Sequence, residues 1–288
     1  MVVTRPDWLK IKCPDANKMH HIKGLMDKLK LHTVCESAQC PNAGECFGNS
    51  TATFMIMGDV CTRNCAFCAV NHGSPEVIDH SEPENLANAV SVLGLKHVVI
   101  TSVTRDDLAD GGANHFAAVV QAVRQKKPDV SIELLIPDMG GDAAALTVIA
   151  KASPDVLNHN METVPSLYGK VRPQANYQRS IDLFKFVKSV NPKLITKSGM
   201  MLGLGEKAED VIGVMRDLHN AGCNILTLGQ YLRPSSEHIP MERYITPEEF
   251  EKYRQEGLAI GFRAVVANPL VRSSYYAREA YREALAAY

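Results

Sequence analysis

The chain has 288 residues, 45% of them hydrophobic, which is enough to bury the core of one large domain or two small ones. Its 31 basic and 32 acidic residues give a formal net charge of -1, so no overall attraction to nucleic acid or to an anionic membrane is expected. No apolar stretch reaches the roughly 18 to 20 residues of a membrane span, and the N-terminal residues lack the apolar core of a signal peptide. We therefore expect a globular cytoplasmic protein.

Residues 1–52 are polar, contain cysteines and show few strand patterns, so they are predicted to form an N-terminal extension. The stretch "SAQCPNAGECFGNS" is typical of a loop that is ordered by something other than a hydrophobic core. A metal centre would supply that order.

From residue 53 onward, short apolar runs alternate with amphipathic stretches, which is the pattern of parallel strands and helices. Strands are predicted at 53–58, 97–103, 131–137, 155–160, 194–202 and 225–232. Helices are predicted at 83–95, 113–127, 142–152, 177–190, 207–222 and 246–261. This alternation predicts an α/β fold, and six strands are too few for an eight-stranded barrel. Periodicity alone does not distinguish a barrel from an open sheet.

The eight cysteines could form at most four disulfides, which would be few for a chain of this length, and no export signal is seen. Their clustering in a reducing compartment instead favours metal ligands. Cys13 and Cys223 stand apart, and Cys223 is interpreted as a buried structural thiol. The other six form two groups of three, namely Cys35, Cys40 and Cys46, followed by Cys61, Cys65 and Cys68.

Two kinds of metal site fit these groups. Zinc takes four ligands, and His32 or His72 could complete a zinc site with one of the triplets. The second group, with C-x3-C-x2-C spacing, is better matched by an iron–sulfur cluster in which one iron lacks a protein ligand. Such an open iron is a binding site.

The second group, with Phe67 before its last cysteine and a strand ahead of it, resembles the motif of radical S-adenosylmethionine (AdoMet) enzymes. The resemblance implies that Cys61, Cys65 and Cys68 hold a 4Fe-4S cluster whose fourth iron binds AdoMet. It also implies that reductive cleavage of AdoMet yields a deoxyadenosyl radical, which removes hydrogen from unactivated carbon.

The upstream spacing C-x4-C-x5-C, together with "RSSY" at 272–275, closely resembles the lipoyl synthase family. The match extends through "TSVTRDDLADGGANHF", "NHNMETVPSLY", "KSGMMLGLGE" and "GQYLRPS", so it covers nearly the whole chain. The resemblance implies an auxiliary 4Fe-4S cluster, and its ligands would be Cys35, Cys40, Cys46 and Ser274.

The resemblance implies a partial (β/α)6 barrel at 53–232, whose open face is covered by the extension at 1–52 and by a C-terminal helix and tail at 233–288. The expected reaction inserts sulfur from the auxiliary cluster at C6 and C8 of an octanoyl chain. That chain would be attached to a lysine of a lipoyl carrier domain or of the glycine-cleavage H protein. Further expected partners are an electron donor of the ferredoxin or flavodoxin type and an iron–sulfur carrier that rebuilds the auxiliary cluster.

Further residues are expected to contact AdoMet. The resemblance implies this for the aromatic residue of the cysteine motif and for the glycine pair at 111–112, and the others are predicted because they follow predicted strands. The full set is Phe67, Gly111, Gly112, Asn160, Glu162, Gly205 and Glu206. Each has a structural alternative. The glycine pair at 111–112 could form an ordinary turn, the pair after the fourth strand could cap its loop, and Glu206 could begin a helix.

Two other functions remain as alternatives. Another radical AdoMet enzyme that inserts sulfur, biotin synthase-like or methylthiotransferase-like, would share the second cysteine group, but the first group and the RSSY motif weigh against it. A non-enzymatic iron–sulfur carrier would leave the open coordination site and the large α/β body without a purpose.

Overall fold

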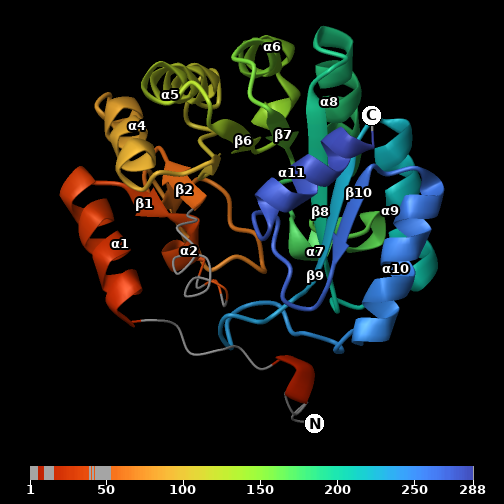
Figure 1. Cartoon of the computed structure of the whole chain (residues 1–288). Helices are drawn as coiled ribbons and strands as arrows, with labels where there is room; N and C mark the ends of the chain where they lie inside the picture. Colours follow the sequence, from red (N-terminus) through yellow and green to blue (C-terminus); the bar gives the residue numbers. More distant parts are fainter. Residues whose placement is uncertain (1–5, 10–15, 39, 41, 43–52, 288) are drawn as a thin grey trace.

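A computed structural model describes residues 6–9, 16–38, 40, 42 and 53–287, with 16–22 described for the backbone only. Its main sheet has eight strands, and all neighbouring strands are parallel except β1 and β2 (Figure 1). Their spatial order is β1 (His32–Thr33), β2 (Thr53–Ile56), β5 (His97–Ser102), β6 (Ser131–Leu135), β7 (Val156–Asn158), β8 (Ile195–Leu202), β9 (Ile225–Gln230) and β10 (Ala264–Ala267). Apart from the antiparallel edge strand β1, the strands therefore follow one another in space as they do in the sequence.

Helices follow most of the parallel strands and surround the sheet in Figure 1. The main ones are α1 (Ala16–Leu29), α4 (Glu82–Val92), α5 (Ala113–Lys126), α6 (Ala143–Lys151), α8 (Tyr177–Val190), α9 (Ala208–Asn220), α10 (Pro247–Ile260) and α11 (Ala277–Ala286). Shorter elements are η1 (Asp7–Leu9), α2 (Val34–Ser37), η2 (Met139–Gly141), η3 (Pro165–Leu167), α7 (Tyr168–Val171) and the two-stranded pair β3 (Val60–Cys61) and β4 (Asn71–His72). None of the described helices combines the length and the apolar character that a membrane crossing requires.

The strands form because their apolar runs are buried on both faces, as a covered parallel sheet requires. Successive side chains point to opposite faces. On β6, Ile132 and Leu134 pack with the helices in the main core, whereas Glu133 belongs to the other face. The face away from these helices is called the inner face below.

Capping residues determine where the helices begin and end, and an apolar stripe determines which side of each helix faces the sheet. Helix α10 begins with a capping box of Thr246 and Glu249 and ends at Gly261, whose φ of 119° favours glycine. Helix α9 buries Val211 and three further apolar residues at spacings of three, four and seven. The sequence therefore specifies where these helices lie on the sheet.

Helix α11 packs against the beginnings of the last four strands. Its small residues Ala280 and Ala284 form a buried cluster with Val156, Ile195, Ile225 and Ala264, which open β7 to β10. Figure 1 shows α11 crossing this region of the sheet. The C-terminal helix thus covers the inner face at one end and leaves the other end for a site.

The expected fold class, α/β with a partial barrel, is confirmed. All six predicted strands and the six predicted helices are present. The structure adds strands that were not predicted. In the main sheet they are β10, which extends the parallel sheet beyond β9, and the two-residue β1, and the separate pair β3 and β4 was not predicted either.

Candidate functional site

A cavity of about 530 Å³ lies on the inner face of the sheet. Most of its strand residues carry odd numbers on β2, β5, β6, β8 and β9, which is the face opposite the helical core, and the even-numbered exceptions are Ser102 and Met200. Six predicted ligands line it, namely Cys35, Cys40, Cys61, Cys65, Cys68 and Ser274. The structure thus brings both cysteine groups and the distant serine motif to one cavity. Cys46 and Cys13 lie outside the described residues.

In the second cysteine group, Cys61 ends β3, and Cys65 and Cys68 lie on the loop that joins β3 to β4. The Sγ atom of Cys61 accepts hydrogen bonds from the backbone N–H groups of Arg63, at 3.4 Å, and Thr104, at 3.3 Å. The N–H of Cys68 donates to the carbonyl of Cys65 at 3.0 Å, and the Cys68 carbonyl lies 3.0 Å from Nε2 of His238. The segment that carries the three thiols is therefore fixed by its own turn and by neighbouring loops.

The first cysteine group meets the C-terminal tail. Cys35 lies on α2, and its carbonyl accepts the N–H of Cys40 at 3.0 Å. Two residues further on, Asn42 is buried and donates from Nδ2 to the Leu270 carbonyl at 2.6 Å. This bond ties the cysteine segment to the tail four residues before Ser274.

The tail itself passes very close to β9. A Cβ added to Gly229 would lie 2.0 Å from the Val271 carbonyl oxygen, so only glycine allows this approach. Ser274 lies in the turn before α11, whose N-cap residue is Tyr276, with a φ of 51°. Ser274 is therefore not the N-cap of α11, which removes one structural alternative for its side chain.

The thiols suit a group that brings positive charge. Burial raises the pKa of Cys35 to about 11 and that of Cys68 to about 12, and it also raises the pKa of Cys65. These groups become thiolates where a cation compensates for burial, as iron does. Among the described residues no three His, Cys, Asp or Glu side chains gather around one point as the ligands of a single ion would. A 4Fe-4S cluster places each thiolate on a different iron, so thiols spread around a cavity fit it.

Asn160 and Glu162 line the cavity just beyond β7. Glu162 has a φ of 65°, which is uncommon for a residue other than glycine, and its backbone bonds to Gly199 and Met201 hold it there. Its carboxylate accepts Nδ2 of Asn160 at 3.0 Å, and burial raises the pKa of Glu162. The Oδ1 atom of Asn160 is buried and has no partner among the described residues. This pair is therefore poised to bind a polar ligand.

Arg172 also lines the cavity, and the sequence analysis did not identify it. Its Nη1 donates to the carbonyls of Asn160, at 2.9 Å, and Met161, at 3.1 Å, while its buried Nε has no partner among the described residues. Arg272, beside the predicted serine ligand, is another cation in the lining. No local signal in "GKVRPQ" marks Arg172, because its position depends on how the loop after β7 folds back.

Of the other residues predicted to contact AdoMet, one lines the cavity and four do not. Phe67 lines the cavity and packs against a small apolar cluster that includes Tyr231. Gly111, Gly112, Gly205 and Glu206 lie outside the described lining of the cavity. Their predicted roles are untested and stay predictions.

The structure gives two of them clear local roles. Gly112 is the N-cap residue of α5 with a φ of 89°, and a Cβ added there would lie 2.3 Å from Sδ of Met57. The carboxylate of Glu206 accepts the N–H groups of Gly203, at 2.7 Å, and Leu204, at 2.8 Å. These contacts account for the residue types whether or not a ligand is nearby.

Cys223, two residues before β9, is 2% exposed and lies outside the cavity lining. Its Sγ contacts the Ile225 carbonyl at 3.3 Å, and burial raises the pKa of Cys223 to about 12. These surroundings are those of a buried structural thiol.

Comparison with known proteins decides the family. The sequence model of the Radical SAM superfamily matches residues 55–218, and the model of the N-terminal domain of lipoyl synthase matches residues 3–40. Lipoyl synthase from Alkaliphilus metalliredigens is 55% identical over 276 residues, covering 96% of this chain and 95% of that protein. Lipoyl synthase from Rubrobacter xylanophilus is 53% identical, covering 97% of this chain and 87% of that protein. The chain belongs to the lipoyl synthase family.

Solved structures support the fold of this lipoyl synthase family member. Methylornithine synthase (PylB) has a TM-score of 0.52 at 17% identity, covering 88% of this chain and 83% of that protein. HydG, a maturase of the [FeFe]-hydrogenase, has a TM-score of 0.55 at 11% identity, covering 96% of this chain and 69% of that protein. Membership of the family makes the chain a radical AdoMet sulfurtransferase that uses AdoMet and 4Fe-4S clusters, as expected.

Proposed function

We propose that this enzyme inserts sulfur at C6 and C8 of an octanoyl chain on a carrier-protein lysine, and that the sulfur comes from an auxiliary 4Fe-4S cluster. The single observation that carries the proposal is the cavity lined by members of both cysteine groups and by Ser274. Because radical formation and sulfur delivery act on the same chain, both groups must face one enclosed space.

The cysteine groups have separate roles in this proposal. The AdoMet-binding cluster is held by Cys61, Cys65 and Cys68, and the auxiliary cluster by Cys35, Cys40, Cys46 and Ser274. With AdoMet bound, the cluster held by the second cysteine group would supply the electron for reductive cleavage of AdoMet, the chemistry needed to remove hydrogen from unactivated carbon. The protein holds both reactants in place and excludes water between them.

On the AdoMet side, Asn160 and Glu162 are proposed to bind polar groups of the nucleoside or the methionine part. The Oδ1 of Asn160, which has no partner in the described part of the chain, can accept a hydrogen bond, and the carboxylate of Glu162 is held in the cavity by its strained backbone. Phe67 supplies an apolar wall. Gly111, Gly112, Gly205 and Glu206 lie outside the described lining of the cavity, and their role as AdoMet contacts stays a prediction.

The apolar part of the lining suits an aliphatic chain. The wall includes Met55, Val70, Val103, Ile136 and Leu232. Burying methylene groups against these side chains stabilises the complex by about 0.8 kcal/mol for each methylene. This term would hold an octanoyl chain extended in the cavity.

The partners follow from this chemistry. We propose an octanoylated lipoyl domain or glycine-cleavage H protein as substrate, a ferredoxin or flavodoxin as electron donor, and an iron–sulfur carrier that restores the auxiliary cluster. The clustered free thiols favour a cytoplasmic location, where cysteines stay reduced. We also propose that residues 1–52 and 233–288 act as covers of the central unit at 53–232.

The test uses anaerobically reconstituted enzyme, an octanoyl-lysyl peptide, AdoMet and dithionite, with the peptide mass as readout. Two clusters correspond to about eight iron atoms per chain, so iron content is measured first. We expect the mass of the lipoyl peptide. The Cys35/Cys40/Cys46→Ala variant should cleave AdoMet and leave the peptide unthiolated. Lipoyl peptide formed by that variant at the parent rate would contradict the proposal.

A further inference from the structure

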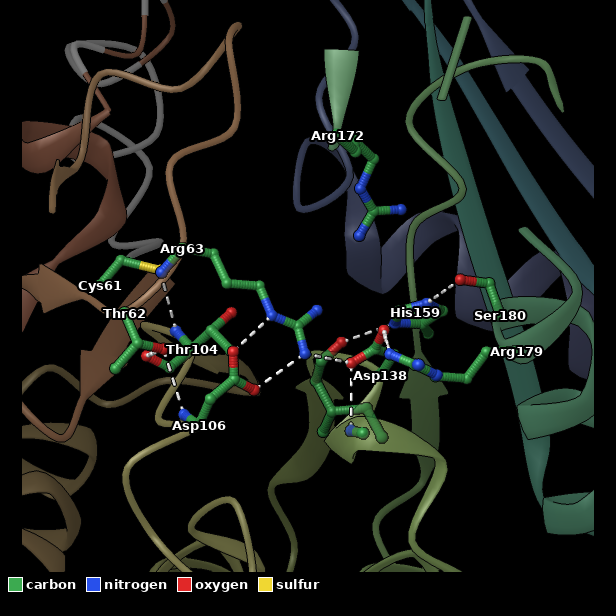
Figure 2. A network of polar contacts seen from close by, with 12 residues as sticks. Cys61, Thr62, Arg63, Thr104, Asp106, Asp138, His159, Arg172, Arg179 and Ser180 are labelled. Carbon is green, nitrogen blue, oxygen red and sulfur yellow. Dashed lines mark hydrogen bonds and ion pairs between the residues drawn. The ribbon is translucent and has the colours of Figure 1, made fainter. Parts of the chain in front are cut away.

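Arg63 lies between the first two cysteines of the second group, and its side chain is only 7% exposed. Its guanidinium contacts two carboxylates on different loops (Figure 2). Nε and Nη2 donate to the two oxygens of Asp106 at 2.7 and 2.8 Å, and Nη2 also donates to Oδ1 of Asp138 at 2.8 Å. The planar fork of arginine makes all three bonds at once, which a lysine ammonium cannot copy.

The far end of this contact is rigid. Asp138 is fully buried just after β6, and its Oδ1 also accepts the N–H of Gly140 at 3.1 Å. Its Oδ2 accepts Nη1 of Arg179 at 3.2 Å. Burial opposes ionisation of Asp138, but the hydrogen bond and charge of Arg63 hold its pKa at about 2. The carboxylate is therefore charged and tightly held at neutral pH.

The same loop is anchored a second time by Thr62. Its N–H and Oγ1 donate to the Thr104 carbonyl at 3.0 and 2.9 Å, and its Oγ1 accepts the N–H of Asp106 at 3.1 Å. These bonds join the cysteine loop to the segment that follows β5. Both N–H groups that reach Cys61 Sγ, those of Arg63 and Thr104, belong to this joined pair of segments. Figure 2 shows Cys61 and Arg63 held against Thr104 and Asp106.

We propose that Arg63 is a positioning residue that keeps Cys61 Sγ within reach of these two N–H donors, and that it thereby raises the reduction potential of the cluster bound by the second cysteine group. The inference rests on the proposed function, in which that group holds a 4Fe-4S cluster. Hydrogen bonds to a ligating sulfur stabilise the extra negative charge of the reduced cluster, so their loss favours the oxidised state.

Charge alone would not have this effect. The two arginines and two carboxylates of the network sum to zero, so the network presents little net charge to the cluster. Replacing Arg63 with lysine keeps that balance and removes the fork. Arg63→Lys therefore separates positioning from charge.

The experiment measures the midpoint potential by redox titration, with the electron paramagnetic resonance signal of the reduced cluster as readout. The titration is run on the holoenzyme and on the Cys35/Cys40/Cys46→Ala variant. This variant keeps only the cluster held by the second cysteine group. For Arg63→Lys we expect the ratio of reduced to oxidised cluster at a fixed potential to fall about tenfold. For one electron this corresponds to a midpoint potential that is more negative by about 59 mV. Thr62→Val, which removes the two hydrogen bonds of Oγ1 and leaves the backbone bond to Thr104, should shift the potential in the same direction.

Arg179→Lys is the matched control, because it makes the same change on the other arginine of Asp138 without touching the loop, and its potential should equal the parent's. If Arg63→Lys retains its iron and melts like the parent but shows the parent's potential, the inference is overturned. Equal shifts in Arg63→Lys and Arg179→Lys would overturn it as well. Failure of the second cysteine group to bind a cluster at all would instead contradict the proposed function.

Discussion

At the residue scale, the spacing of the cysteines carried most of the information. C-x3-C-x2-C and C-x4-C-x5-C indicate ligand sets because cysteines so clustered rarely serve a core, and five of the six line one cavity in the structure. Reasoning from spacing could not identify Arg172 and Arg63. Each acts through partners more than ten residues away, and a single arginine in a loop carries no pattern of its own.

Ser274 allows a sharp test at this scale. Because Tyr276 is the N-cap of α11, Ser274→Ala should not lose a helix cap, which would cost about 1 kcal/mol. It should lose iron from the auxiliary cluster, or fail to deliver sulfur, while it still cleaves AdoMet. Iron content, product mass and AdoMet cleavage are measured together. Ser273→Ala is the neighbouring control and should be milder. Normal lipoyl product with full iron content in Ser274→Ala would exclude the ligand role.

Buried titratable groups predict the pH dependence of stability. His159 is fully buried, and its pKa falls to about 4 from an ordinary 6.5, mainly because burial disfavours its charged form. The pKa of Glu133 is held at about 2 despite its burial, by Lys197 and His97. As pH falls below 6.5 the unfolded chain binds the His159 proton first, so folding weakens. Stability from Glu133, present above about 4.5, is then lost toward pH 2.

The measurement is the urea midpoint of the metal-free protein from pH 7 to pH 3. We expect a continuous fall, and His159→Gln should flatten the part between pH 6.5 and pH 4. A midpoint that stayed constant over that interval in the parent chain would show that His159 is not held neutral by the fold.

At the scale of elements, the strand and helix pattern was predictable wherever an element has a long periodic run. The six predicted strands are apolar runs that the sheet buries on both faces, so their signal is strong. β1 has only two residues, and β10, although as long as the predicted strand β2, is followed by an irregular segment; both are strands because a neighbour offers a pairing edge. Short strands of this kind are determined by tertiary contacts that the local sequence does not encode.

Helix α11 gives the prediction at this scale. Ala284 is fully buried against the beginnings of β7 to β10, so a larger side chain there would overpack the cluster. Ala284→Leu should lower the free energy of unfolding by about 1–3 kcal/mol, measured by urea denaturation. Ala286→Leu, at an exposed position of the same helix, is the control and should change stability by less than about 0.5 kcal/mol. Equal effects of the two substitutions would mean that α11 does not pack as described.

At the scale of the whole molecule, the fold brings together segments that are far apart in the sequence. Asn42 bonds to Leu270 across the chain, and the tail crosses β9 at Gly229, so the first cysteine group and Ser274 reach a cavity that the second cysteine group also lines. From the sequence, the proximity of the two cysteine groups and Ser274 was expected only through the family resemblance. Spacing within each group says nothing about the distance between groups, which depends on closure of the sheet and on the path of the tail.

The central claim is that the first cysteine group holds the sulfur that enters the product. The most direct measurement reconstitutes the enzyme with sulfide enriched in a heavy sulfur isotope and follows the mass of the octanoyl-lysyl peptide after reaction with AdoMet and dithionite. We predict a lipoyl peptide that carries two heavy sulfur atoms, and no thiolated peptide from the Cys35/Cys40/Cys46→Ala variant. A lipoyl peptide whose sulfur has the natural isotope distribution would contradict the claim, because the sulfur would then come from outside the reconstituted clusters.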